Sequence, residues 1–204
     1  MGNLTVIDSK VIAENNGLTG IIFTGEAEFQ KANVLITGTK GKSYWNAGMR
    51  LLKQAARATI DKDTKIQITD NQVTGIFLDA NSNLTAEDGA KIFVTRNNAA
   101  QENSTTEKGL ARMGGGIVVR GGAQAVLPAT TEIYNNHAAL AGDDIYVEAG
   151  GTIKFAPVGS DWELDDCRHS IDGWYDDSEA AEQAEEPATQ AAAVSGGRWN
   201  AHPD

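Results

Sequence analysis

The sequence has few of the features that would each point to a familiar class of protein. Only one cysteine, Cys167, occurs in 204 residues, so no internal disulfide framework can hold the fold. No apolar run approaches the roughly 20 residues that a helix needs to cross a bilayer, and no signal peptide opens the chain. Hydrophobic residues make up 41% and charged residues 22%. This composition is that of a folded domain rather than a disordered one.

Basic residues are also scarce, and the acidic ones are unevenly placed. The net charge is -11. Residues 1–160 hold 16 acidic and 15 basic residues, whereas residues 161–204 hold 12 acidic residues against Arg168 and Arg198. Such a chain lacks the basic stripe that nucleic acid requires, and its acidic tail would be repelled by phosphates and by anionic lipids. We therefore expect neither nucleic acid nor a membrane as a partner.

Internal repeats are the strongest positive signal. Residues 16–23 (Asn-Gly-Leu-Thr-Gly-Ile-Ile-Phe) align without a gap with residues 71–78 (Asn-Gln-Val-Thr-Gly-Ile-Phe-Leu). Similar elements occur at residues 116–119 and 144–147. Short apolar strands that end in asparagine precede these elements, and the asparagines concerned are Asn16, Asn71, Asn97 and Asn136. Self-similarity of this kind is typical of solenoid proteins.

The repeats predict a specific architecture. Apolar alternation, as in Ile66 and Ile68, predicts strands of three to five residues separated by Gly, Asn and Asp turns. Three such strands per coil of about 20–30 residues, stacked in parallel, give a right-handed β-helix. The asparagines then share one turn, where they tolerate the left-handed conformation and can form an amide ladder. A β-sandwich does not need the same residues at matching offsets, so we predict an all-β, right-handed parallel β-helix over residues 1–160.

Two insertions are expected to interrupt the coils. Residues 41–58 carry apolar side chains at helical spacing and predict a short capping helix. Its apolar face would consist of Met49, Leu52 and Ala56. Tyr44 and Trp45 stand beside the basic residues of this segment and are candidate partner-binding residues. Residues 99–114 predict a polar lateral loop of the kind that carries binding specificity. The candidate residues in this loop are Glu102 and Glu107.

The C-terminal segment, residues 161–204, is expected to form an acidic cap rich in tryptophan. Trp162 follows the last coil and would cover its open end, which otherwise exposes unpaired strand edges. Trp174 and Tyr175 are candidate aromatic anchors for a partner or a sugar. Residues 178–197 are polar and weakly patterned, and we expect them to be flexible.

The sequence predicts no catalytic residue, no metal site and no cofactor. β-Helix enzymes that act on polysaccharides need carboxylates clustered on one sheet face. In the repeat body the acidic residues at such positions are scattered: Asp70, Asp79, Asp143 and Asp144. One cysteine and three histidines complete neither a nucleophile–base pair nor a zinc site. The acidic residues of 161–177 do not have EF-hand spacing, so a solvated acidic face is expected there.

Several stretches resemble known repeat families. Residues 114–117 (Gly-Gly-Gly-Ile) and 133–136 (Ile-Tyr-Asn-Asn) are similar to repeats of polymorphic outer-membrane autotransporter passengers. Residues 141–147, followed by 162–167 (Trp-Glu-Leu-Asp-Asp-Cys) and 171–177 (Ile-Asp-Gly-Trp-Tyr-Asp-Asp), resemble another group. This group comprises the repeat domains of large surface proteins of Gram-positive gut bacteria, including adhesins and immunoglobulin-binding proteins.

The resemblance covers roughly residues 3–177 and carries functional expectations. It implies a non-catalytic extracellular module on a bacterial cell surface, monomeric, that presents loops to a host protein. Immunoglobulin is a specific candidate for that protein, and a host glycan is the other partner considered. The resemblance transfers no defined binding residue. Two alternatives stay open: a polysaccharide-binding or polysaccharide-cleaving β-helix, and a structural spacer without a saturable partner.

Overall fold

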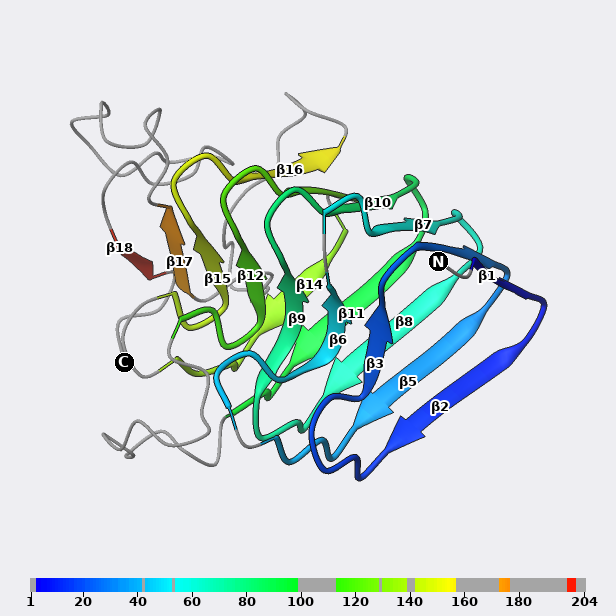
Figure 1. Ribbon diagram of the computed structural model, residues 1–204, viewed down its shortest axis with the longest axis horizontal. Coiled ribbons are helices and arrows are strands. Elements are labelled where there is room, and N and C mark those ends of the chain that lie inside the picture. The colour runs from blue at the N-terminus through cyan, green and yellow to red at the C-terminus, as the bar shows by residue number, and fades with distance from the viewer. Residues whose placement is uncertain are drawn as a thin grey trace.

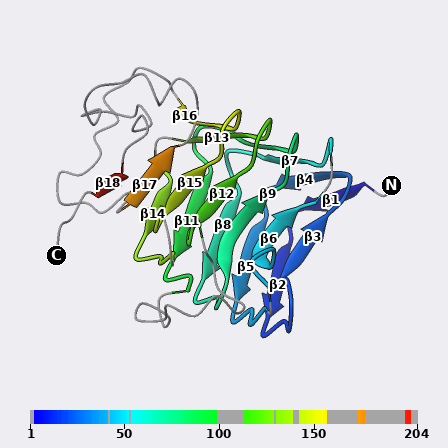
Figure 2. The same cartoon turned by 60° about the vertical axis from the view of Figure 1, so that its left-hand side comes forward.

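The computed structural model describes residues 3–41, 43–52, 54–98, 113–128, 130–138, 142–156, 173–176 and 198–200. Within these ranges every regular element is a strand (Figures 1 and 2). The described residues include no helix of the length and apolar character that crossing a membrane requires.

The strands form three sheets that wind around one core (Figure 1). Sheet A contains β1 (Leu4–Ile7), β4 (Glu26–Gln30), β7 (Arg57–Ile60), β10 (Asn83–Ala86), β13 (Gln124–Pro128) and β16 (Thr152–Ala156). Sheet B contains β2 (Lys10–Glu14), β5 (Asn33–Thr37), β8 (Lys65–Thr69), β11 (Lys91–Thr95) and β14 (Glu132–Tyr134). Sheet C contains β3 (Ile21–Phe23), β6 (Ala47–Leu51), β9 (Thr74–Leu78), β12 (Ile117–Val119), β15 (Ile145–Val147), β17 (Gly173–Asp176) and β18 (Arg198–Asn200).

The chain visits sheets A, B and C in turn and so forms a right-handed parallel β-helix, as the repeats predict. Neighbouring strands pair in parallel, except that β18 runs antiparallel to β17. Figure 2 shows the strands of successive coils lying side by side along the solenoid. Because each strand pairs with its equivalent in the next coil, one residue position forms a row along the whole molecule.

The core consists of the inward rows of the three sheets. In sheet B one row contains Ile36, Ile68, Val94 and Ile133, all fully buried. In sheet C another contains Met49, Ile76, Ile117 and Ile145. The predicted alternation at Ile66 and Ile68 is confirmed, since both side chains are buried. Burying an aliphatic side chain of this size stabilises the fold by about 1.5–3 kcal/mol, so these rows provide the main apolar driving force.

A buried amide ladder runs along the turn between sheets B and C, as the sequence predicts. Asn71 Nδ2 donates to Asn97 Oδ1 at 2.8 Å, and Asn97 Nδ2 donates to Asn136 Oδ1 at 2.9 Å. Asn136 Nδ2 in turn donates to Asp144 Oδ1 at 2.7 Å. Each of these amides also donates to a backbone carbonyl of the preceding coil, those of Ile36, Ile68 and Val94. The ladder thereby joins the third, fourth and fifth coils to one another and, through the Ile36 carbonyl, the third coil to the second.

The left-handed residues of this turn are not the ladder residues themselves. Each ladder position is preceded by a residue with φ between 54° and 67°, and these residues are Asn15, Gly38, Asp70, Arg96 and Asn135. The prediction that the ladder asparagines adopt the left-handed conformation is therefore wrong by one residue. The ladder side chains are selected for their amides, whereas the residue before each of them turns the chain.

The second coil breaks the ladder because Thr39 stands where the other coils have asparagine. Backbone hydrogen bonds from Lys40 N–H to Asn16 O and from Gln72 N–H to Thr39 O align the first, second and third coils at this turn. A threonine side chain is too short to bridge both neighbours. Within the described part of the chain, Asn16 Nδ2 and Thr39 Oγ1 are buried without a hydrogen-bond partner.

A column of glycines, Gly20, Gly48, Gly75 and Gly116, accounts for the glycine of the Gly-Ile signature. A Cβ on Gly75 would lie 2.6 Å from Val94 Cγ1, 2.8 Å from Asn97 Nδ2 and 2.8 Å from Gly116 O. The other three glycines meet the same kinds of atom. Only glycine fits here because the core, the amide ladder and the next coil all converge on this position.

The predicted capping helix over residues 41–58 is wrong. This segment supplies β6 and the start of β7, and Met49 lies in the inward row of sheet C. The predicted loop candidates Glu102 and Glu107 lie outside the described residues. So do Trp162 and the segment 178–197, for which flexibility was expected.

The glycine column gives a matched pair of stability predictions. Gly75→Ala is expected to lower the free energy of unfolding by about 1–3 kcal/mol, because the added methyl overpacks the core and the ladder. Gly17→Ala is the control, since nothing lies within 4 Å of a Cβ at Gly17. Chemical denaturation of both variants checks this. Equal losses of unfolding free energy in the two variants would contradict the explanation that a Cβ cannot fit in the glycine column.

The interrupted ladder predicts a stabilising substitution. Thr39→Asn places an amide between Asn16 and Asn71, gives the buried Asn16 Nδ2 an acceptor and removes the unpaired Thr39 hydroxyl, so the free energy of unfolding should rise by about 1 kcal/mol. Thr39→Ala cannot bridge the gap and serves as the control. Thermal and urea unfolding measure the difference in stability between the two variants. If Thr39→Asn is no more stable than Thr39→Ala, the missing amide at this position does not affect the free energy of unfolding.

Candidate functional site

The outer face of sheet C carries an unusual buried apolar row. Strand register aligns Arg50, Phe77, Val118 and Tyr146 on the side of the sheet away from the core. Phe77 is 4% exposed, Val118 5% and Tyr146 8%, and together with Ala47 they form an apolar cluster separate from the core. Outward residues of a solenoid strand usually meet water, so burial on this face marks a surface that is covered or hollowed.

Tyr44 and Trp45 lie over this row from the turn that precedes β6. Asn46 holds the turn, since its Oδ1 accepts the Ser43 N–H at 2.9 Å and its Nδ2 donates to Thr19 Oγ1. The Trp45 ring meets Phe77 edge-on with centroids 5.7 Å apart, and the Tyr44 ring lies 4.2 Å from that of Trp45. Such contacts are worth about 0.5–1.5 kcal/mol beyond area burial, so the turn is fastened to the sheet.

Two arginines pack against these rings and are held by carboxylates. Arg50 donates through Nε and Nη2 to Asp79, and both side chains are only 14% exposed. Its guanidinium carbon lies 5.3 Å from the centre of the Phe77 ring. Arg120 lies 4.9 Å from the centre of the Trp45 ring and donates through Nε and Nη2 to Glu148, each at 3.1 Å. Both ion pairs are bidentate, which fixes their orientation.

The Arg120–Glu148 pair is held in its charged form. Burial alone would raise the pKa of Glu148, but hydrogen bonds from Arg120 and from the Gly121 N–H outweigh it and leave this pKa below the ordinary 4.5. The hydrogen bond to Glu148 correspondingly raises the pKa of Arg120. At neutral pH the rim therefore presents fixed opposite charges with no net charge.

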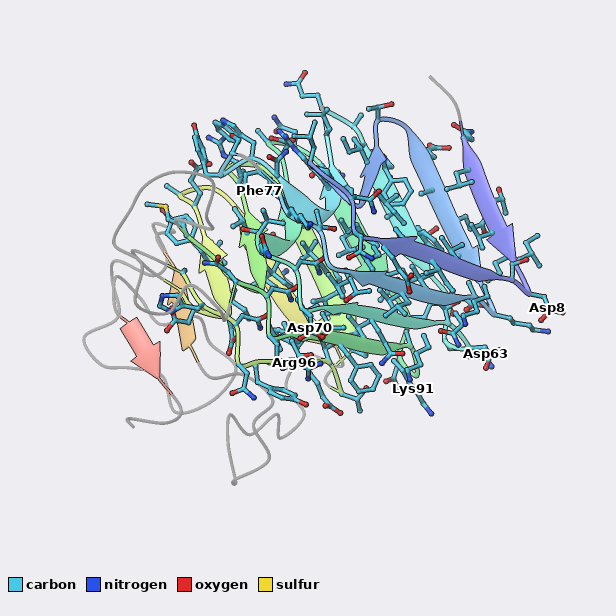
Figure 3. All side chains as sticks on the ribbon, turned by 90° about the horizontal axis from the view of Figure 1, so that it is seen from below. Asp8, Asp63, Asp70, Phe77, Lys91 and Arg96 are labelled. Atoms are coloured by element: carbon cyan, nitrogen blue, oxygen red, sulfur yellow. The ribbon has the colours of Figure 1, made fainter. Side chains whose placement is uncertain are left out.

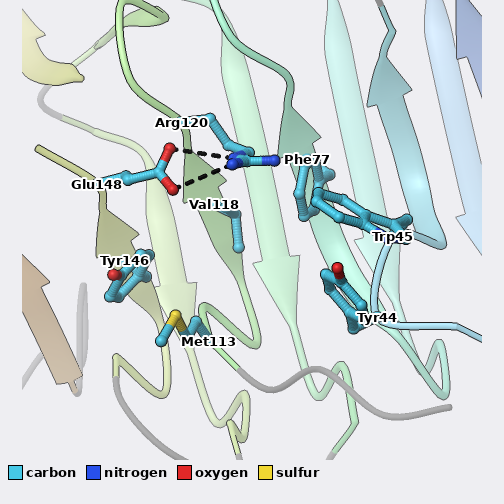
Figure 4. Close-up of a pocket in the computed structure, with 8 residues that line it drawn as sticks. All are labelled: Tyr44, Trp45, Phe77, Met113, Val118, Arg120, Tyr146 and Glu148. Carbon is cyan, nitrogen blue, oxygen red and sulfur yellow. Dashed lines mark hydrogen bonds and ion pairs between the residues drawn. The ribbon is translucent and has the colours of Figure 1, made fainter. Parts of the chain in front are cut away.

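These groups enclose a hollow of about 270 Å³ (Figure 4). Its lining residues are Tyr44, Trp45, Phe77, Met113, Val118, Arg120, Tyr146 and Glu148. Figure 4 shows Tyr146 on one side, Tyr44 and Trp45 on the other, and the Arg120–Glu148 pair at one end. Tyr44 and Met113 are the most exposed of the large apolar side chains here, at 41% and 38%. A flat apolar group with a polar edge fits this arrangement.

A second hollow lies where turns of sheets A and B meet, around Lys62, Asp63, Lys65, Asp88 and Lys91. Its charges are mixed, and the Lys62 ammonium is bound to the Asp63 carboxylate. On the underside seen in Figure 3, Arg96 forms an exposed ion pair with Asp70. Among the residues that the structure describes, no three His, Cys, Asp or Glu side chains gather as metal ligands would. None of these features forms an enclosed site.

The structure brings some of the candidate residues together. Tyr44 and Trp45 both line the sheet C hollow. Trp174 and Tyr175 lie in β17 of the same sheet, with Tyr175 in register with Tyr146. Sequence reasoning missed Phe77, Arg120 and Glu148 as site residues. The sequence nevertheless contains a signal for the rim. In three coils a charged residue stands three positions after the isoleucine of the repeat, and these residues are Asp79, Arg120 and Glu148.

The lowered pKa of Glu148 predicts a pH-dependent contribution to stability. A carboxyl group whose pKa is lower in the folded state stabilises the fold above its unfolded pKa, and this contribution is lost as the pH falls through the folded value. Glu148→Gln should therefore cost stability at pH 7, and its difference from the parent protein should shrink below pH 4.5. Glu132→Gln on β14 is the control. A difference that does not change with pH would contradict the charged-pair account.

Compared with known proteins, the chain matches no family model, no curated protein and no solved structure. The chain itself forms a parallel β-helix whose third sheet carries an aromatic hollow with an ion-paired rim.

Proposed function

We propose that this chain is a non-catalytic extracellular binding module of a bacterial surface protein, adhesin-like, that engages a host extracellular protein through the sheet C hollow. Immunoglobulin is the specific candidate. The hollow is the observation that carries the proposal. The bacterial surface and the host partner rest on the resemblance of the repeats to surface-protein domains.

The chemistry of the hollow suits protein recognition. Residues that dominate protein interfaces are most often Trp, Tyr and Arg that cluster at the centre of a contact surface. Here Tyr44, Trp45 and Arg120 meet at one place on a rigid sheet. Because the arginines are already fixed by Asp79 and Glu148, binding costs little ordering of long side chains.

The lowered pKa of Glu148, the carboxylate that lines the hollow, supports recognition rather than acid catalysis. Polysaccharide hydrolysis needs a general acid whose pKa is raised toward neutrality. The pKa of Glu148 is lowered instead, and Asp79 is bound to Arg50. Glu148 is therefore not poised to donate a proton to a leaving group.

Binding to purified immunoglobulin, and then to proteins of serum and mucosal secretions, tests the proposal. The immobilised chain is expected to give saturable binding, and Tyr44→Ala should weaken it about tenfold or more by removing the exposed aromatic wall. Tyr134→Ala, a tyrosine on the outer face of sheet B, is the matched control. Failure to bind any protein saturably, or equal losses in both variants, would overturn the proposal.

A sugar is the second candidate ligand, favoured by the size and polarity of the hollow. A volume of about 270 Å³ lies just below the range typical of small-molecule pockets, which suits a single ring. The Tyr44 face could contact the apolar side of that ring while Arg120 and Glu148 bond its hydroxyls. Adding an oligosaccharide panel to the same assay distinguishes this ligand, since sugar binding that Tyr44→Ala weakens would replace the protein partner.

A further inference from the structure

The two arginines beside the sheet C hollow differ in how their hydrogen-bond donors are used. Arg50 donates through all three side-chain nitrogens, with Nε and Nη2 bonded to Asp79 and Nη1 bonded to the Trp45 carbonyl at 3.0 Å. Arg120 lines the hollow and donates to Glu148 through Nε and Nη2. In the described stretches of the chain no acceptor is bonded to Arg120 Nη1, although a guanidinium group carries five N–H donors. The hollow therefore contains a donor that the fold itself leaves unused.

The charges around this donor favour a neutral acceptor. The pKa of Arg120 is raised first by its hydrogen bond to Glu148 and, further down the order of causes, by the nearby charge of Asp79. A carboxylate or phosphate that approached Nη1 would meet both of these carboxylates, and the juxtaposition of like charges opposes binding. A carbonyl oxygen accepts the same hydrogen bond without this repulsion. An amide carbonyl is therefore the group that best matches the free donor.

The remainder of the hollow suits a flat apolar ring. Its aromatic walls are Tyr146 on one side and Tyr44 and Trp45 on the other (Figure 4). Aromatic rings attract one another in offset and edge-to-face contacts, and the thioether of Met113 adds a further favourable contact with a ring. The charged groups of the lining lie together at one end. A sugar carries hydroxyls around most of its ring and would leave those far from this end without a charged partner, whereas an aromatic ring needs none.

We propose that the sheet C hollow binds one aromatic side chain of the partner protein, with the ring between Tyr44 and Tyr146 and a neighbouring backbone carbonyl bonded to Arg120 Nη1. In a peptide chain every aromatic side chain is flanked by amide carbonyls, so one residue of the partner supplies both groups. The inference rests on the proposed function, because it takes this hollow as the contact with a host protein. It adds the chemistry of the recognised group and makes Arg120 the residue that determines specificity.

Two small amides test which side chain the hollow recognises. N-acetylphenylalanine amide presents an aromatic ring beside neutral carbonyls, and N-acetylleucine amide differs from it in having no ring. NMR titration of the full chain is expected to give a dissociation constant of about 1 mM for the aromatic amide, as suits so small a ligand. The leucine amide should bind at least about fivefold more weakly, because it lacks the contacts between rings.

The matched variants locate this preference. Tyr44→Ala should remove the difference between the two amides, whereas Tyr134→Ala, on the outer face of sheet B, should preserve it. Equal binding of the two amides by the parent protein, binding of neither, or a difference that persists in Tyr44→Ala would overturn the proposal.

A charged probe tests the selectivity assigned to Arg120. N-acetylphenylalanine as the free acid should bind at least about fivefold more weakly than its amide at pH 7, although an arginine faces it, because Glu148 and Asp79 repel its carboxylate. Glu148→Gln removes one of these charges and should narrow or reverse the preference for the amide. A free acid that binds the parent protein as well as the amide does, or a preference that Glu148→Gln leaves unchanged, would show that Arg120 does not select a neutral carbonyl.

These results separate the inference from the proposed function. If a host protein binds in a Tyr44-dependent way while the aromatic amide neither binds nor competes, the proposed function stands and the aromatic occupant is wrong. If the amide binds in the hollow and no host protein binds, the recognised chemistry stands and the host partner is wrong. If a methyl glycoside binds in a Tyr44-dependent way in place of the amide, the hollow belongs to a glycan and the inference is overturned.

Discussion

The buried amide ladder is the constraint on which the rest of the structure depends. Asn71 and Asn97 each bond the asparagine of the next coil and a carbonyl of the previous one, and Asn136 bonds Asp144 of its own coil and a carbonyl of the previous one. A shift of one residue between coils would leave buried amides without partners, at about 1–3 kcal/mol each, and would turn the apolar rows outward. The ladder and the core therefore require the same register between coils. The column positions must be glycine because the backbone there passes close beside the ladder amides.

The sheet C hollow is a product of this register. Asp79, Arg120 and Glu148 are far apart in the chain, yet each follows its strand of sheet C by one residue. Stacking in register brings Arg120 beside Glu148 and sets both next to the row that contains Phe77 and Val118. A surface built in this way is rigid, since any movement of one strand would disturb the ladder beneath it.

The repeats could be recognised in the sequence because identical contacts in successive coils require identical residues. The fold could be predicted from the residues that recur for this reason, which include Ile66, Ile68 and the three ladder asparagines. The second coil escaped detection because Thr39 replaces the asparagine and Met49 replaces the isoleucine, while the spacing of Met49, Leu52 and Ala56 imitates a helix. The hollow could not be predicted in the same way, because Trp45 of the second coil meets Phe77 of the third only when these two coils stack.

A solenoid also needs a means of stopping, since every parallel coil presents an edge for the next. In sheet C, β18 pairs antiparallel with β17, which reverses the strand direction and so cannot serve as the start of another coil of the same hand.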